Sequence, residues 1–173
     1  SLLKKNKVKV FEGFGSLVKD LSNIKKIRIK TKDNNIEKTA KNVILATGAR
    51  SRNLPFVSSD GVNIWDYKTA MTPPKLPSSL IIVGSGAIGM EFASFYNDLG
   101  VDVTIIEALP SILPNEDTDI SEIVKLSFEK RGIKITTNST LKSVISKENS
   151  VSVEIITNEK VVKINSEKLI LAI

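Results

Sequence analysis

The sequence predicts an α/β fold with a parallel β-sheet, an antiparallel β-meander and a β-rich segment in front of them. Three observations predict it. A short β-branched run, residues 80–83, leads into a glycine-rich turn and then into a helical pattern. A second apolar run follows at residues 101–106, as in a βαβ unit. Alternating apolar residues then recur in three short stretches, which is typical of a meander.

The glycine-rich turn reads Gly-Ser-Gly-Ala-Ile-Gly over residues 84–89. Helical spacing follows, because apolar side chains recur every three or four positions until Gly100 stops the helix; they are Ile88, Phe92, Phe95 and Leu99. The second run ends on Glu107. Strand, turn, helix, strand and terminal acid therefore arrive in the order of a dinucleotide-binding βαβ unit.

Each residue type suits that chemistry. Gly84 can make the tight turn, Gly86 lets a pyrophosphate approach the main chain, and Gly89 lets helix and strand pack closely. The helix N-terminus offers unpaired N–H groups to phosphates. Glu107 can accept hydrogen bonds from ribose hydroxyls, and it would repel the 2′-phosphate of NADP. Residues 108–111 add no Arg or Lys, so the pattern favours NAD; the alternative is a glycine-rich turn in another α/β protein.

Residues 80–173 are therefore predicted to form a Rossmann-like, three-layer ββα domain of the FAD/NAD(P)-binding type. After Glu107 we expect a helix from about 117 to 131 and a strand at 133–135. The predicted meander strands and the last buried strand are residues 141–145, 151–156, 161–164 and 169–172. Residues 53–79 read as a connector with four of the six prolines, a short helical turn at 65–71, and Trp65 as a packing anchor.

Residues 1–52 read as β-rich. The predicted features are alternation at Val8, Val10 and Phe11, a turn at 13–15, a strand through Ile27 and Ile29, a turn at 33–35, and a buried strand at 43–46. Residues 27–45 also match residues 153–171 without a gap, which predicts two copies of one supersecondary unit. We expect strand 43–46 to lack sheet partners, and so to be disordered or to pair with another copy.

Composition excludes several classes of function. The 173 residues include neither His nor Cys, so a thiol redox centre, a His base and a His/Cys metal site are impossible on this chain. The net charge is +6, but the basic residues read as a scattered, solvated surface, so we expect no nucleic-acid partner. Neither a signal peptide nor a membrane-spanning run is visible.

The chain resembles the flavoprotein pyridine nucleotide-disulfide oxidoreductases, and among them the dihydrolipoyl (dihydrolipoamide) dehydrogenase family. The matching segments, in the family's order, are VKVFEGFGSL, KNVILATGAR, VNIWDYKTAM, LPSSLIIVGSGAIGMEFA and ILPNEDTDI. The resemblance implies a partial flavin domain at 1–52, the connector 53–79 and a truncated NAD domain at 80–173. It also implies NAD and FAD as cofactors.

By this resemblance the NAD site comprises Gly84, Ser85, Gly86, Ala87, Ile88, Gly89, Met90, Glu91, Glu107 and Leu141. The FAD contacts would be Gly15, Thr47, Gly48 and Ala49. Leu141 would lie against the adenine, and Glu91 near the nicotinamide, paired with a flavin-domain lysine. A mid-helix acid such as Glu91 is otherwise usually a solvated surface residue.

The resemblance implies an enzyme that oxidises dihydrolipoyl groups and reduces NAD⁺ within a 2-oxo acid dehydrogenase complex. Its partners would be lipoyl domains of the acyltransferase and a second copy in a homodimer, in the bacterial cytoplasm or the mitochondrial matrix. The first glycine motif, the cysteine pair and the His–Glu pair of the family are absent, so we expect a fragment that is inactive alone. The alternatives are a glutathione or mercuric reductase, and a structural module that binds no nucleotide. The missing Arg residues after Glu107 count against glutathione reductase.

Overall fold

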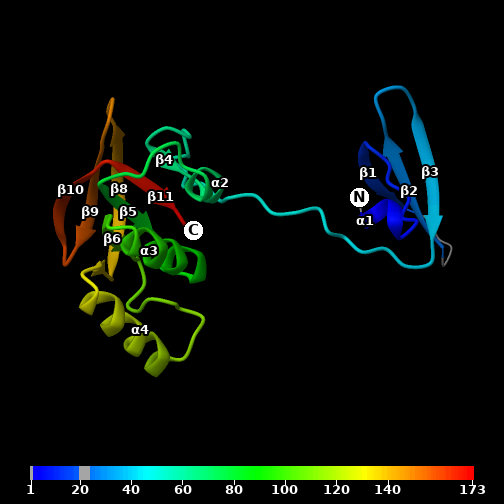
Figure 1. Ribbon diagram of the computed structural model, residues 1–173. Coiled ribbons are helices and arrows are strands. Elements are labelled where there is room, and N and C mark those ends of the chain that lie inside the picture. Colours follow the sequence, from blue (N-terminus) through cyan, green and yellow to red (C-terminus); the bar gives the residue numbers. More distant parts are fainter. Residues whose placement is uncertain (1, 20–23) are drawn as a thin grey trace. The chain divides into compact units, whose positions relative to one another are not determined.

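The computed structural model describes residues 2–19 and 24–173, and the chain forms two compact units, Ser1–Ala49 and Arg50–Ile173 (Figure 1). The expected domain boundaries at residues 52 and 79 concern a larger protein and stay a prediction. The connector does not stand apart from the second unit, because it contributes a strand to that unit's sheet.

The first unit is a three-stranded antiparallel sheet. Its elements are α1 (Leu2–Lys5), β1 (Phe14–Val18), β2 (Lys25–Lys30) and β3 (Asn35–Ala40), with the strand order β1-β2-β3. The strand through Ile27 and Ile29 is confirmed as β2, and the turn that follows is closed by hydrogen bonds between Thr31 and Asn34.

Two predictions for this unit are wrong. Phe14 and Gly15 belong to β1 rather than to a turn, because Gly15 pairs with Ile29 and the alternation continues on both sides. Residues 8–11 form no strand and are exposed, although Lys38 lies 5.3 Å above the Phe11 ring. Their alternation therefore does not correspond to pairing with any described strand.

The predicted buried strand at 43–46 is also wrong. The stretch has no helix or strand, and the side chains of Ile44 and Leu45 are 90% and 70% exposed. A strand exists only through its hydrogen-bonded neighbours, and no described strand pairs with this stretch. Disorder of this stretch and its pairing with another copy of the chain stay predictions.

The second unit is built on a five-stranded parallel sheet. Its strands are β4 (Ile64–Trp65), β5 (Ser79–Val83), β6 (Asp102–Ile106), β7 (Lys134–Thr136) and β11 (Lys168–Leu171), in the order β4-β11-β5-β6-β7. Strands β5, β6, β7 and β11 were predicted, whereas β4 was not. Strand β11 lies between β4 and β5 although it follows all the others in sequence.

The two faces of this sheet are covered by different layers (Figure 1). The helices α2 (Tyr67–Met71), α3 (Ala87–Asp98) and α4 (Thr118–Lys130) cover one face, where Leu80 and Ile82 join their core. The meander of β8 (Ser139–Ser146), β9 (Val151–Thr157) and β10 (Lys160–Ser166) covers the other, where Ile81 and Val83 join its core. This arrangement confirms the three-layer ββα prediction.

Helix α3 is confirmed, but its buried face is not the predicted one. The residues against the sheet are Met90, Ala93 and Tyr96, each at most 4% exposed. Ile88 and Phe95 are about half exposed, at 55% and 51%. The apolar spacing that revealed the helix therefore belongs to a second apolar surface, which is not covered by the described residues.

The connector packs through aromatic residues. Trp65 is 1% exposed, its indole N–H donates to the Val62 carbonyl at 2.9 Å, and its ring lies 6.4 Å from that of Tyr96. The Tyr96 hydroxyl donates to the Ala70 carbonyl at 2.6 Å. The packing role expected for Trp65 and the helical turn after it are both confirmed.

The internal repeat is confirmed as two hairpins with one register. Ile29 pairs with Ile36 in the first copy, and the matching residues Ile155 and Val162 pair in the second. The preceding strand agrees as well, since Gly15 lies opposite Ile29 just as Leu141 lies opposite Ile155. The copies differ after the hairpin, where only the second continues into a sheet strand, β11.

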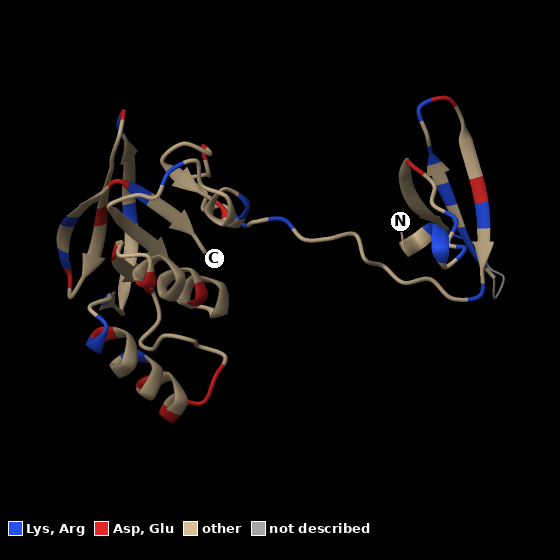
Figure 2. Cartoon of the chain, in the orientation of Figure 1, with Lys and Arg blue, Asp and Glu red and all other residues tan. Residues whose placement is uncertain are grey.

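Basic residues are more concentrated in the first unit than expected (Figure 2). Residues 1–49 hold twelve of the 25 Lys and Arg residues and four of the 19 Asp and Glu residues. Three of the four cations on β2, namely Lys26, Arg28 and Lys30, alternate to one face of the sheet, and Arg28 pairs with Glu37 at 3.0 Å. The positive charge is thus a property of one unit, not of the whole chain.

Candidate functional site

The glycine-rich turn joins β5 to α3, and two of its glycines are required by the fold. Gly84 has φ +100°, and a Cβ there would lie 2.5 Å from the carbonyl oxygen of Ala172. A Cβ on Gly89 would overlap the carbonyl oxygen of Gly84 and would touch the Ala172 side chain at 3.4 Å. The tight turn and the close packing expected of these two residues are therefore both present.

Gly86 differs from both. Its backbone angles, φ −65° and ψ 177°, suit any residue, and a Cβ added to it would meet no atom of the described residues within 4 Å. Neither conformation nor packing requires glycine at this position. Among the described residues, therefore, no side chain fills the space above the main chain at the N-cap of α3 or caps that end of the helix.

Glu107 lies at the end of β6, and its carboxylate is directed at this turn. The side chain is 7% exposed. One oxygen, Oε2, accepts from the Ser85 main-chain N–H at 2.8 Å and from the Ser85 hydroxyl at 2.5 Å, and Oε1 accepts from the Leu109 N–H at 2.8 Å. The structure thus brings together the turn and the acid, which are 22 residues apart.

The other residues expected in the NAD site are distributed around this centre. Ala87 and Ile88 are exposed in the first turn of α3, and Leu141 is half-buried on β8. Met90 is 4% exposed, and its side chain belongs to the core between α3 and the sheet. Ser85 is fully buried and its polar groups are occupied within the protein.

Glu91 is exposed and lies along an apolar groove, so its side chain is not buried against the sheet. The groove has a volume of about 470 Å³ and is lined by Tyr67, Met71, Ile88, Glu91, Phe92 and Phe95. It begins at the first turn of α3, directly beside the glycine-rich turn. An exposed carboxylate beside an apolar groove is suited to orient a bound group or to pair with a cation.

The residues expected to contact FAD are not brought into one site. Gly15 lies within β1, and Thr47–Ala49 is an exposed stretch without helix or strand, with φ +80° at Gly48. A cavity in this unit is lined by other residues: Glu12, Gly13, Lys30, Thr31, Lys32 and Asp33.

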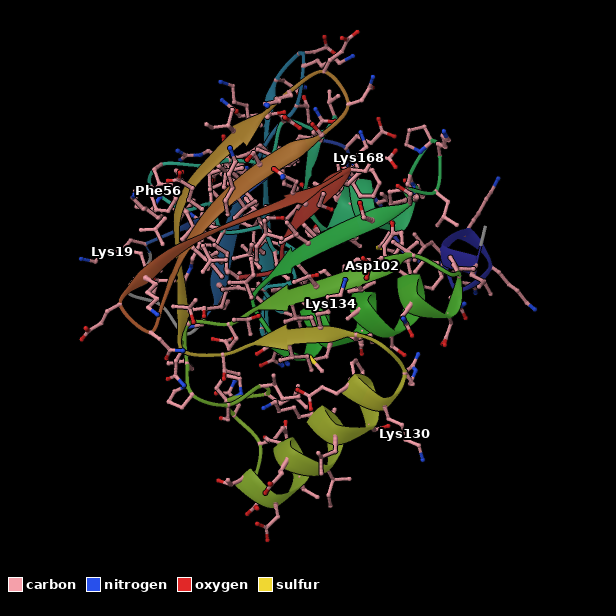
Figure 3. The ribbon with its side chains drawn as sticks, turned by 90° about the vertical axis from the view of Figure 1, so that its left-hand side faces the viewer. Lys19, Phe56, Asp102, Lys130, Lys134 and Lys168 are labelled. Atoms are coloured by element: carbon pink, nitrogen blue, oxygen red, sulfur yellow. The ribbon has the colours of Figure 1, made fainter. Side chains whose placement is uncertain are left out.

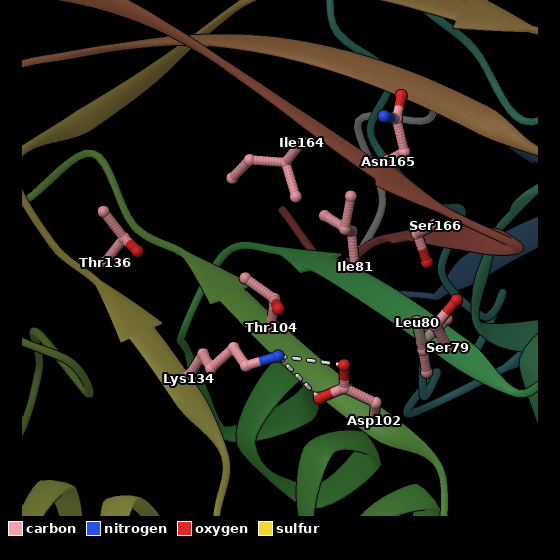
Figure 4. Close-up of a pocket in the computed structure, with 10 residues that line it drawn as sticks. All are labelled: Ser79, Leu80, Ile81, Asp102, Thr104, Lys134, Thr136, Ile164, Asn165 and Ser166. Carbon is pink, nitrogen blue, oxygen red and sulfur yellow. Dashed lines mark hydrogen bonds and ion pairs between the residues drawn. The ribbon is translucent and has the colours of Figure 1, made fainter.

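A further cavity, of about 290 Å³, lies at the opposite end of the parallel sheet (Figure 4). Ser79, Asp102 and Lys134, which line it, begin or adjoin the amino ends of β5, β6 and β7. Asp102 and Lys134 form an ion pair at 2.9 Å there (Figure 3). Nucleotides bind at the carboxyl ends of parallel strands, so this cavity is not the site.

Sequence reasoning missed the part of the site made by the loop after Glu107. The Leu113 N–H donates to the Ser85 carbonyl at 2.9 Å, so this loop is bound to the glycine-rich turn, and Leu113 itself has φ +47°. No local pattern marks such main-chain contacts. Among the described residues, no group of acidic side chains could hold a metal ion, and no helix is long and apolar enough to cross a membrane.

Comparison with known proteins places this geometry in a family. All residues, 1–173, match the family described as pyridine nucleotide-disulphide oxidoreductase. The chain belongs to that family, whose members are FAD-dependent enzymes that use NAD(H).

Within this family, the chain is similar to curated dihydrolipoyl dehydrogenases. Dihydrolipoyl dehydrogenase of Zymomonas mobilis is 46% identical over 155 residues, which is 90% of this chain and 33% of that protein. The enzyme of the same name from Rhizobium etli is 47% identical over 78% of the chain and 28% of its own length. The chain thus spans about a third of the length of these relatives.

Solved structures similar to this chain include flavoproteins of the same family. LpdA from Mycobacterium tuberculosis superposes with a TM-score of 0.85 at 30% identity, covering 99% of this chain and 37% of that one. An HOCl-induced flavoprotein disulfide reductase from Escherichia coli gives a TM-score of 0.79 at 26% identity, over 99% of this chain and 37% of its own.

Proposed function

We propose that this chain is the NAD(H)-binding part of a dihydrolipoyl dehydrogenase. The observation that carries the proposal is the open main chain at Gly86, a glycine that the fold itself does not require. A pyrophosphate that approaches the N-cap of α3 explains why no side chain is present there. The likeness to curated dihydrolipoyl dehydrogenases supports the choice of enzyme.

The residues of this chain would divide the binding between them. The N–H groups at the start of α3 would donate to the pyrophosphate, and the partial positive charge of the helix end would favour it. Glu107 would accept from the adenosine ribose through a carboxylate that is already oriented. Because that carboxylate is fixed in place, it would disfavour a 2′-phosphate beside it, so the site would select NAD over NADP.

The nicotinamide end is assigned to the groove around Glu91. The groove opens beside the first turn of α3 and has apolar walls, which suits a flat heteroaromatic ring. Glu91 would orient the ring region and pair with a lysine of the flavin-bearing part, as the family resemblance implies. No proton transfer is assigned to Glu91, because within the part of the chain that the structure describes its carboxylate has no hydrogen-bond network that would support one.

FAD, when bound in the whole enzyme, would supply the redox chemistry between the dithiol and the nicotinamide. The internal repeat of residues 27–45 and 153–171 supports a contact between this chain and FAD. Ala172, after β11, lies against Gly84 of the glycine-rich turn, and its counterpart in the first copy is Ala46, just before Thr47. Thr47, Gly48 and Ala49 are thus suited to contact FAD beside a second glycine-rich turn, with Gly15 on the adjoining meander.

The whole protein would oxidise dihydrolipoyl groups of an acyltransferase and reduce NAD⁺, as part of a 2-oxo acid dehydrogenase complex. It would act as a homodimer in the bacterial cytoplasm, or in the mitochondrial matrix of a eukaryote. These assignments rest on the relatives. The chain alone would bind nucleotide without turnover.

The test is a calorimetric titration of the purified chain with NADH and, separately, with NADPH. Binding of NADH with little response to NADPH is the expected result. Absence of binding by either nucleotide would contradict the proposal for this chain and would favour the alternative of a structural module.

A related disulfide reductase is the second candidate, supported by the structural likeness to the flavoprotein disulfide reductase. Residues 108–111, Ala-Leu-Pro-Ser, carry no cation for a 2′-phosphate, which disfavours a glutathione reductase. A mercuric reductase differs in parts of the protein outside this chain. Preference for NADPH in the titration would favour this second candidate.

A further inference from the structure

Ser85 makes more contacts than its place in a glycine-rich turn requires. It is fully buried, and its N–H and hydroxyl both donate to Oε2 of Glu107. Its carbonyl accepts from the Leu113 N–H at 2.9 Å. Ser85 therefore connects the turn to the acid at the end of β6 and to the loop that follows that acid.

We propose that Ser85 is a positioning residue that sets the preference for NADH over NADPH by fixing the carboxylate of Glu107. This inference rests on the proposed function. Any residue at position 85 would offer a main-chain N–H, so the contribution specific to serine is the second donor, its hydroxyl.

The pattern of donors indicates which oxygen serves the ligand. Oε2 already accepts two hydrogen bonds, both from Ser85, whereas Oε1 accepts one, from Leu109. A carboxylate oxygen accepts about two hydrogen bonds, so the free capacity lies on Oε1. With Oε2 fixed, Oε1 keeps one orientation and is ready to accept from a ribose hydroxyl without reorganisation.

The same fixation determines the response to a 2′-phosphate. A carboxylate that is buried and bound on both oxygens cannot turn to the solvent, so it stays beside the added negative charge. Without the serine hydroxyl, Oε2 loses a donor and the side chain gains freedom to rotate. Binding of NADH then weakens, because its acceptor is no longer held, and binding of NADPH improves, because the repulsion is relieved.

The experiment measures dissociation constants for NADH, and for NADPH in competition with NADH, on the 173-residue chain and its variants. In Ser85→Ala we expect the ratio of the NADPH constant to the NADH constant to fall by about tenfold, the scale of one lost hydrogen bond to a charged group. In the Glu107→Gln background, the further change Ser85→Ala should leave the ratio unchanged, because no charge remains to be positioned.

The matched control is Ser152→Ala. Ser152 is another buried serine of this unit, on β9, and its hydroxyl has no hydrogen-bond partner among the described residues. Removing it should leave the ratio at the parent value. Fluorescence of Trp65, the one tryptophan of the sequence, verifies that each variant remains folded.

Three results would each be decisive. A parent-like ratio in Ser85→Ala, or an equal loss of both affinities, would overturn the positioning role and leave the NAD assignment intact. A parent chain that binds neither nucleotide would instead contradict the proposed function, and the role of Ser85 in selectivity with it. A lowered ratio in Ser85→Ala alone, absent in the Glu107→Gln background, is the outcome that supports the proposal.

Discussion

The α-carbon of Gly84 faces the carbonyl oxygen of Ala172, so closely that a Cβ at Gly84 would lie 2.5 Å from that oxygen. Ala172 directly follows β11, and Gly84 directly follows β5, its neighbour in the sheet. The end of one strand therefore forms the wall behind the turn of the other. The glycines of this turn consequently separate into those that the fold needs and one that it does not.

Substitution of the glycines should reveal that division. Gly89→Ala places a methyl group against the Gly84 carbonyl, and we expect a loss of about 2 kcal/mol or more in the free energy of unfolding, as in an overpacked core. Gly86→Ala meets open space and should cost less than about 1 kcal/mol, the scale of an N-cap exchange.

Gly86→Ala, the variant expected to have little effect on stability, should have a clear effect on NADH binding. Folded Gly86→Ala should bind NADH at least about tenfold more weakly, because the added methyl group would occupy the space through which the pyrophosphate approaches the main chain. A tenfold change corresponds to about 1.4 kcal/mol in the binding free energy. Urea unfolding followed by Trp65 fluorescence gives the stabilities, and calorimetry gives the affinities. A Gly86→Ala chain that binds like the parent would mean that no ligand approaches the main chain there.

Loss of the acid should weaken nucleotide binding specifically. For Glu107→Ala we expect a loss of about 1.5–3 kcal/mol in the binding free energy of NADH, the usual range for a hydrogen bond to a charged group. Glu122→Ala, an exposed acid on α4, is the control with the same change of charge. Unaltered NADH affinity in the Glu107 variant would refute its assignment to the ribose.

The Tyr96 hydroxyl should contribute measurably to stability. Tyr96→Phe leaves the Ala70 carbonyl without its donor, and the loss should be about 1–3 kcal/mol in the free energy of unfolding. Tyr67→Phe is the matched control, since Tyr67 is only half-buried. Equal urea midpoints for the two variants would contradict the prediction.

Burial also raises the pKa of the Tyr96 phenol above its ordinary value of 10.0. The unfolded chain would therefore release this proton at lower pH than the folded chain. The stability that depends on this group is present below about pH 10 and decreases as the pH rises beyond it. Ultraviolet absorbance should show Tyr96 ionising after Tyr67 in a pH titration of the folded parent.

Asp60 should make the second unit sensitive to acid. Burial acts to raise the pKa of this carboxyl, but N–H donors from Ile64, Val62 and Asn63 and the Ser146 hydroxyl outweigh it, and the pKa lies below the ordinary 3.8. The stabilisation is therefore present above about pH 4 and is lost as the pH falls through the lowered value.

Asp60→Asn should test this. At neutral pH we expect a cost of about 1 kcal/mol, as for a lost side-chain cap at a solvent-screened position. The difference between parent and variant should shrink as the pH falls below 4. A constant difference between pH 7 and pH 3, measured by urea unfolding, would show that the ionisation of Asp60 is not responsible.

The elements of the βαβ unit could be predicted from sequence because each has a local signal. The β-branched run before Gly84, the apolar spacing after it and the run that ends at Glu107 all correspond to observed elements. The spacing did not reveal which face of α3 is buried, because Ile88 and Phe95 form a second apolar surface while Ala93, a small residue, packs against the sheet.

Other features depend on contacts that no local pattern encodes. Strand β4 consists of two residues and exists only because β11 pairs with it. Residues 43–46 have the composition of a buried strand but no described neighbour, so composition alone misleads there. The contact between Ser85 and Glu107 joins two predicted residues, yet its hydrogen bonds follow from the packing of β5 beside β6.

The position of β11 has a consequence for how the second unit forms during synthesis. Residues 168–171 enter the sheet between β4 and β5, and a ribosome releases both of those strands well before it releases β11. Until then β4 has no partner and β5 has one open edge. Nascent chains that stop short of β11 should therefore expose unpaired strand edges and need chaperone protection. We expect the sheet to be completed only after residues 168–171 have been synthesised.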